Sequence, residues 1–124
     1  MFSAICVGIG GFIGACLRYC FTIIFPSNWD FPLNTLLINI IGSFIIGVIF
    51  AMSENTSYMS PNSKLFLQTG ICGGFTTFST FSLETFNLLE KGNYFLGGLY
   101  IITSVLFCLI GVMIGKSLIS HFTS

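Results

Sequence analysis

The stretch Gly73-Gly-Phe-Thr-Thr-Phe-Ser-Thr-Phe-Ser82 decides how this chain folds. It lies within an apolar run from about Lys64 to about Leu89, although Gly and Thr are poor helix formers. If the run crosses a membrane, a break in the helix frees backbone amides and carbonyls that lipid cannot satisfy, so the break must lie inside protein or beside a water-filled path. The stretch therefore predicts a broken helix whose freed carbonyls suit a hard cation such as Na⁺, with a merely kinked helix as the alternative.

The composition of the whole chain indicates a membrane setting. Of its 124 residues, 54% are hydrophobic and 6% are charged, whereas soluble domains are about 25% charged. A spanning helix needs roughly 20 mostly apolar residues, and charge-poor segments of that length occupy about 3–25, 33–53, 64–89 and 94–115. The sequence therefore predicts an all-α membrane protein, with one four-helix transmembrane domain over residues 1–124 that crosses the cell (plasma) membrane several times and contacts its lipid.

Several classes of function are excluded by what the sequence lacks. Four Lys and Arg residues balance four Asp and Glu residues, so no basic patch exists to bind a nucleic acid. The five cysteines lie in apolar segments, and the single histidine, His121, is far from them near the C-terminus, so the cysteines are interpreted as small packing residues. No nucleophile with a matching base and no phosphate-binding loop is present, so the chain is not expected to be an enzyme.

The distribution of positive charge predicts how the chain inserts. Four spans place both termini on one side of the membrane, together with Lys64 and Lys116, while Lys91 and Arg18 belong to the other side. Because positive residues orient membrane proteins, this tie gives almost no orientation signal. It favours copies that insert both ways and pair as an antiparallel dimer, unless so few charges balance by chance.

Polar and small residues recur at steps of four, which places them on one face of a helix. In the second segment they are Thr35, Asn39, Ser43 and Gly47, and in the fourth they are Tyr100, Ser104 and Cys108. Such stripes often serve close packing of membrane helices. A primary amide within the span is costly without a polar partner, so Asn39 either lines a polar cavity or makes a structural hydrogen bond.

The aromatic residues of the central stretch offer a way to contact an anion. Phe78 and Phe81 flank Ser79 and Thr80. Phenylalanine usually fills a core, but ring edges carry partial positive charge and can face an anion without the full charge of Lys or Arg. Weak coordination of this kind suits a conductor, because a bound ion must also leave.

Two ionisable residues are expected within or near the spans. Arg18 either extends to a lipid headgroup or attracts anions at an aqueous vestibule. Glu84 is expected near an interface, and without a partner it is given no role.

Four signatures along essentially the whole chain resemble the CrcB, or Fluc, family of fluoride channels. In order they are Gly10-Gly-Phe-Ile-Gly-Ala-Cys-Leu-Arg-Tyr19, Thr35-Leu-Leu-Ile-Asn39 followed by Gly42 and Gly47, the stretch from Gly73 to Ser82, and Tyr100 with Ser104. The third signature is the most specific. Two positions depart from the family pattern: Cys108 stands where a hydroxyl residue is expected, and Asn34 stands where many members have Gly.

The resemblance implies an antiparallel, dual-topology homodimer with two pores, a broken third helix and a central structural Na⁺ ion. Backbone carbonyls of Gly73 and Thr76 from both subunits would hold the ion. Fluoride would meet the ring edges of Phe78 and Phe81, with the amide of Asn39 beside them. The remaining pore residues would be the hydroxyls of Ser79, Thr80, Tyr100 and Ser104, with Arg18 at the vestibule.

The function implied by the resemblance is a fluoride-selective channel that passively exports fluoride and protects the cell from its toxicity. The alternative is a small multidrug-type exporter that couples cation export to protons, which also combines four short helices with dual topology. That mechanism needs a carboxylate in the first helix, where this chain has Arg18 and no acidic residue. A structural subunit without transport, whose polar stripes are packing seams, is the third hypothesis.

Overall fold

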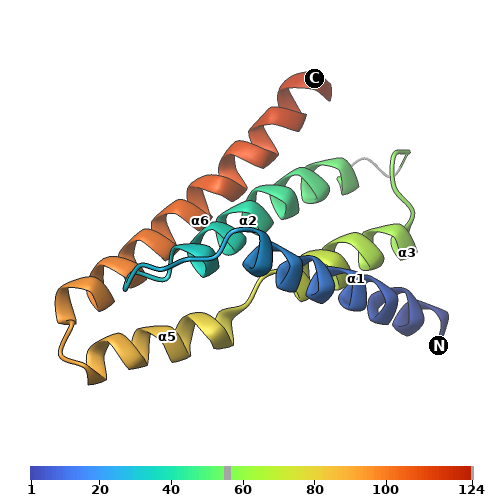
Figure 1. Ribbon diagram of the computed structural model, residues 1–124. Coiled ribbons are helices and arrows are strands. Elements are labelled where there is room, and N and C mark those ends of the chain that lie inside the picture. The colour runs from blue at the N-terminus through green and yellow to red at the C-terminus, as the bar shows by residue number, and fades with distance from the viewer. Residues whose placement is uncertain (55–56, 124) are drawn as a thin grey trace.

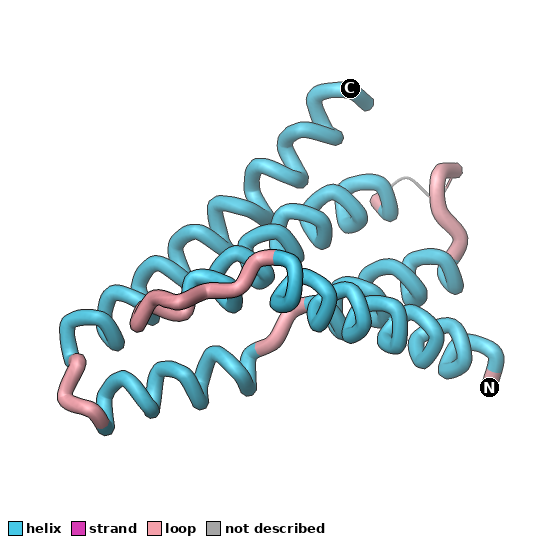
Figure 2. Tube along the Cα trace, in the orientation of Figure 1, coloured by secondary structure: helices cyan, strands magenta, loops and turns pink. Residues whose placement is uncertain are grey.

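The computed structural model describes residues 1–54 and 57–123, and within them the chain forms helices and short connections without a strand (Figures 1 and 2). In chain order the elements are α1 (Phe2–Ile24), α2 (Leu33–Ser53), α3 (Pro61–Lys64), the π-helix η1 (Leu65–Cys72), α4 (Gly73–Phe75), α5 (Phe78–Glu90) and α6 (Tyr94–Thr123). Three of them, α1, α2 and α6, are long and apolar enough to cross a membrane. The bent segment from α3 to α5 supplies the fourth helix of the expected set, so the predicted multi-pass membrane fold is confirmed.

The predicted helix limits agree best with those of the structure where the segment is uniformly apolar. Helix α2 covers the predicted range 33–53, and α1 begins one residue before residue 3. Helix α6 continues eight residues past the predicted end at 115, to Thr123. At about 1.5 Å per residue its 30 residues extend about 45 Å, longer than a hydrocarbon core of about 30 Å. The polar residues after Gly115 therefore do not end the helix.

The helices pack as two pairs. Helix α2 lies along α6, and α1 lies along η1 and α4, while α5 contacts α6 beyond the break (Figure 1). The second pair approaches closely because Gly10 faces Gly70: a Cβ atom added to Gly70 would lie 2.8 Å from the Gly10 Cα. Glycine seams of this kind hold membrane helices together through backbone contact.

The connections follow the breaker residues of the sequence. Helix α5 ends in a Schellman motif, in which the amide of Asn93 donates to the Leu88 carbonyl and that of Gly92 to the Leu89 carbonyl. Gly92 has a φ of 82°, which favours glycine. The predicted loop 54–63 is shorter in the structure, because Ser60 caps α3 at Pro61. Its Asn55 lies outside the described residues.

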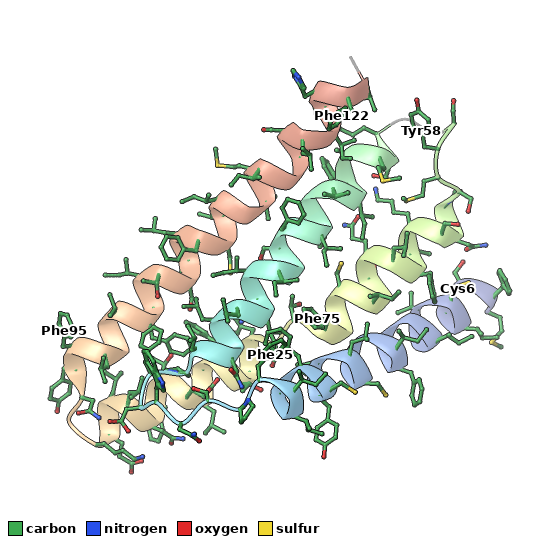
Figure 3. The ribbon with its side chains drawn as sticks, turned by 45° about the horizontal axis from the view of Figure 1, so that its top comes forward. Cys6, Phe25, Tyr58, Phe75, Phe95 and Phe122 are labelled. Carbon is green, nitrogen blue, oxygen red and sulfur yellow. The ribbon has the colours of Figure 1, made fainter. Side chains whose placement is uncertain are left out.

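The buried core is small and most apolar side chains face outward. Tyr100 is completely buried and packs with Leu36 and Leu88. In contrast, Phe95 and Phe122 point away from the bundle near opposite ends of α6 (Figure 3). An apolar exterior of this kind is expected where lipid is the solvent, as in a membrane protein.

Candidate functional site

The helix breaks at Thr76 and Thr77, between α4 and α5. Both residues are extended, with φ and ψ of −77° and 158° at Thr76 and of −150° and 115° at Thr77. The Thr76 hydroxyl turns back and donates to the Cys72 carbonyl at 2.8 Å. The break therefore lies in the middle of the stretch from Gly73 to Ser82 that predicted it, and the third helix is not merely kinked.

Asn39 of α2 supplies the hydrogen bonds that the broken helix lacks. Its Oδ1 accepts from the Thr77 amide at 2.9 Å, and its Nδ2 donates to the Thr77 carbonyl at 3.2 Å. One side-chain amide thus satisfies both backbone groups of the residue at the break. Of the two interpretations left open for Asn39, the structural hydrogen bond is present, and the side chain also borders a cavity described below.

Thr77 begins α5 by capping it. Its Oγ1 accepts from the Thr80 amide at 3.2 Å and donates to the Thr80 hydroxyl at 3.0 Å. Threonine is a favourable residue at this position because it satisfies an otherwise unpaired amide of the first turn. Thr77 was not among the residues predicted from the sequence, although a threonine that precedes a helical segment is a known capping signal.

These two interactions free two particular carbonyls. In a continuous helix the Thr77 amide would donate to the Gly73 carbonyl, and the Thr80 amide would donate to the Thr76 carbonyl. Here the first amide donates to Asn39 and the second to the Thr77 hydroxyl. The carbonyls of Gly73 and Thr76, which the family resemblance assigns to Na⁺, are thus among those that the break deprives of their helical donors.

A cavity of about 370 Å³ opens beside the break, and we call it the break cavity. Its walls come from α2, η1, α4, α5 and α6, and it contains no charged residue. The lining residues are Asn39, Gly42, Ser43, Ile46, Gln68, Cys72, Gly73, Thr76, Thr77, Phe78, Phe81, Ser104, Val105 and Cys108. Six of the ten residues predicted for the ion sites are therefore brought together in one place: Asn39, Gly73, Thr76, Phe78, Phe81 and Ser104.

Two buried polar atoms in the break cavity have no hydrogen-bond partner among the described residues. They are the Ser104 Oγ and the Gln68 Oε1. Gln68 was not among the residues predicted from the sequence. The signal that singled out Asn39, a primary amide inside an apolar span, applies equally to Gln68.

Tyr100 and Glu84 do not line the break cavity, but Tyr100 packs on Phe81, which does. The Tyr100 hydroxyl donates to the Glu84 Oε1 at 3.3 Å, and its ring packs on Phe81 with centroids 5.0 Å apart. Glu84 and Thr80 border a second cavity of about 590 Å³, the loop cavity, between the connection 25–32 and α5. Phe81 lines the break cavity and packs on Tyr100, and Tyr100 is the partner of Glu84 that the sequence could not supply.

Three of the predicted residues, Phe78, Ser79 and Arg18, differ in their exposure and in their distance from the site. Phe78 is 78% exposed, with its ring 5.5 Å from that of Phe81. Ser79 is exposed, and its hydroxyl lies 3.5 Å from that of Thr77. Arg18 is half-buried on α1 and borders neither the break cavity nor the loop cavity.

The described residues contain no group of three or more His, Cys, Asp or Glu side chains that could hold a metal ion. Gly73 is exposed, and a Cβ atom added to it would meet nothing within 4 Å. The surface beside the first residue of α4 is thus open.

Comparison with known proteins places this geometry in context. The family model described as "CrcB-like protein, Camphor Resistance (CrcB)" matches residues 5–116. A protein of Ruminiclostridium cellulolyticum named "Fluoride-specific ion channel FluC" is 46% identical, over 100% of this chain and 97% of the relative. Proteins of the same name are 49% identical in Clostridium novyi, over 93% of this chain and 91% of the relative, and 44% identical in Methanococcus vannielii, over 94% of each.

The pairing of Asn39 with Thr77 predicts a specific loss of stability. Asn39→Ala leaves both Thr77 backbone groups unpaired, and each such group costs about 1–3 kcal/mol. We expect the melting temperature of the purified protein in detergent to fall by about 5–15 °C. Ser43→Ala, one turn along the same face of α2, is the matched control and should change it little. Equal melting temperatures for the two variants would contradict the assigned role of Asn39.

Proposed function

Because this chain belongs to the CrcB family, we propose that it is a fluoride-selective channel that lets fluoride leave the cell passively and so limits its toxicity. The proposal rests on one observation above all: the break in the third helix opens onto a cavity lined by weak hydrogen-bond donors and by no charged residue. Fluoride enters cells as the neutral acid and is trapped as the anion at the higher pH inside. A negative potential inside the cell then expels the anion through a passive path.

The break cavity suits a small, tightly hydrated anion. A pore must replace the water around such an ion with donors at little net cost. Here the donors are the Ser104 hydroxyl, the ring edges of Phe78 and Phe81, and the second N–H of the Asn39 amide. The N-terminus of α5 adds the positive end of a helix dipole. None of these groups holds an anion as firmly as a buried Lys or Arg, so the ion can leave.

The hydroxyls of the first turn of α5 connect this cavity with the loop cavity. Thr80 borders the loop cavity while its hydroxyl is bonded to that of Thr77, which borders the break cavity. Ser79 lies beside them, and the Tyr100 hydroxyl donates to Glu84, which borders the loop cavity. In this proposal Arg18 attracts anions toward an aqueous mouth of the path.

The proposed active unit is an antiparallel, dual-topology homodimer in the plasma membrane. The exposure of Phe78 and Gly73 next to the break cavity supports it, because a second subunit would cover that open side. The even balance of positive charge on the two sides of the membrane also favours both orientations.

The dimer is proposed to hold a structural Na⁺ ion at its centre, bound by the carbonyls of Gly73 and Thr76 from both subunits. Hard cations prefer oxygen ligands, and these two carbonyls lack the amides that a continuous helix would give them. When bound, the ion supplies positive charge that neutralises the carbonyl ends of the two broken helices.

The function is tested by fluoride release from proteoliposomes that contain only this protein. A fluoride electrode should record fast release once a potassium ionophore is added, because potassium must carry the balancing charge, and matched vesicles should release little chloride. Phe78→Ile and Phe81→Ile should each slow fluoride release by about tenfold or more, since an aliphatic side chain has no positive ring edge.

The control for these variants is Phe86→Ile, which changes an exposed ring of α5 that does not border the break cavity. All proteins are compared as folded dimers on gel filtration. A well-folded wild-type dimer without ionophore-dependent release would contradict the channel and favour proton-coupled cation export. Wild-type rates in both single variants would remove the rings from the mechanism.

The sodium proposal predicts that stability depends on that cation. A ligand present at about 100 times its dissociation constant stabilises the folded state by about 2.7 kcal/mol. Exchange of sodium for choline during purification should therefore lower the melting temperature and shift the protein from dimer toward monomer. Restoring sodium should reverse both changes, and a dimer of unchanged stability in choline would argue against the ion.

A further inference from the structure

Gln68 lies in the wall of the break cavity, opposite the polar row of α6. It is followed four residues later by Cys72, at the end of η1, and eight residues later by Thr76, at the break, and all three border the cavity. Across from them, α6 presents Ser104 and, one turn later, Cys108. Gln68 thus adds a second primary amide, besides that of Asn39, to a lining that otherwise consists of hydroxyl, thiol and apolar groups.

The oxygen of the Gln68 side-chain amide, Oε1, is buried and forms no hydrogen bond within the described part of the chain. Ser104 is only 7% exposed, and its Oγ is equally unpartnered. Buried polar groups in native proteins are almost always satisfied, so two unpaired groups in one cavity point to an occupant that forms hydrogen bonds.

The contrast with Asn39 shows what a structural amide looks like in this protein. Both polar atoms of Asn39 pair with the Thr77 backbone, which fixes the side chain and its orientation. No such pairing fixes Gln68, so its amide can turn either its oxygen or its two N–H donors toward the cavity.

Cys108 leaves the α6 side of the break cavity without a strong hydrogen-bond donor beyond Ser104. A thiol is a weak hydrogen-bond donor compared with a hydroxyl or an amide. The donors that α6 presents to the cavity are therefore weaker beyond Ser104. Of the two primary amides in the lining, that of Asn39 pairs with the Thr77 backbone, whereas the Gln68 oxygen has no hydrogen-bond partner among the described residues.

We propose that Gln68 is an ion-contacting residue, whose amide N–H groups bind the permeating fluoride together with Ser104 and replace the strong donor that is missing at Cys108. This inference rests on the proposed function of the chain as a fluoride channel. It assigns part of the ion path to η1, in addition to the break itself.

The experiment is fluoride release from proteoliposomes after addition of a potassium ionophore. Gln68→Met keeps the length of the side chain and removes its N–H donors, so release should slow by about tenfold. Gln68→Glu keeps the shape and replaces the donors with acceptors that repel an anion, so its release should be at least as slow. Thr69→Val, at the exposed neighbouring position outside the cavity lining, is the matched control and should release fluoride at the wild-type rate.

Rescue distinguishes contact with the ion from a packing role. Cys108→Ser places a hydroxyl in the same cavity, so it should raise release by about threefold or more in the Gln68→Met background and by clearly less in the wild-type background. A cavity that Gln68 merely fills would show no such difference between the two backgrounds.

The outcomes separate this inference from the proposed function. A silent wild-type protein would overturn both. An active wild-type protein with unchanged release in Gln68→Met would overturn only the role of Gln68, as would a slow Gln68→Met that Cys108→Ser does not improve. If Gln68→Met does not form a folded dimer, Gln68→Glu decides, and release at the wild-type rate in that variant would overturn the role.

Discussion

The pair of hydrogen bonds between the Asn39 amide and the Thr77 backbone is the interaction on which the rest of this structure depends. A helix interrupted inside a membrane exposes groups that lipid cannot satisfy. One side chain of a neighbouring helix satisfies both groups at the critical residue. The break can then persist, α5 can begin afresh at its Thr77 cap, and the carbonyls of Gly73 and Thr76 lose their helical partners.

The arrangement of helices around the break explains why it opens a cavity and does not collapse. Helix α1 packs along η1 and α4, and it approaches η1 closely where Gly10 meets Gly70. Helix α2 lies along α6. Between these two pairs lies a space lined by two amides, by hydroxyls and thiols, by aromatic rings and by apolar side chains, with no charged residue. Such walls replace water around an anion without trapping it, which is what a passive conductor requires.

The sequence predicts the main features of this architecture. Apolar length alone gives α1 and α2 to within about one residue, and the Gly and Thr content of the central stretch places the break. The end of α6 is missed because polar residues past Gly115 continue the helix beyond the expected boundary. Nothing in the sequence predicts the π-helical geometry of η1.

The candidate site is less completely predictable, because its details depend on contacts between helices that are distant in the sequence. Asn39 stands out as an amide within an apolar span, but its partner, Thr77, is 38 residues away. Glu84 gains a role only when α6 brings Tyr100 to it. Gln68 carries the same signal as Asn39 and is recognised only when its unpaired oxygen is seen in the cavity wall.

The most direct test of this account is hydrogen exchange at the Thr77 amide, followed by NMR on the isotope-labelled protein in micelles. A bonded amide at a satisfied break should exchange slowly in the wild-type protein. In Asn39→Ala the same amide should exchange faster by about tenfold or more, while amides in the middle of α2 keep their protection. Equally fast exchange of the Thr77 amide in both proteins would contradict the claim that Asn39 holds the break.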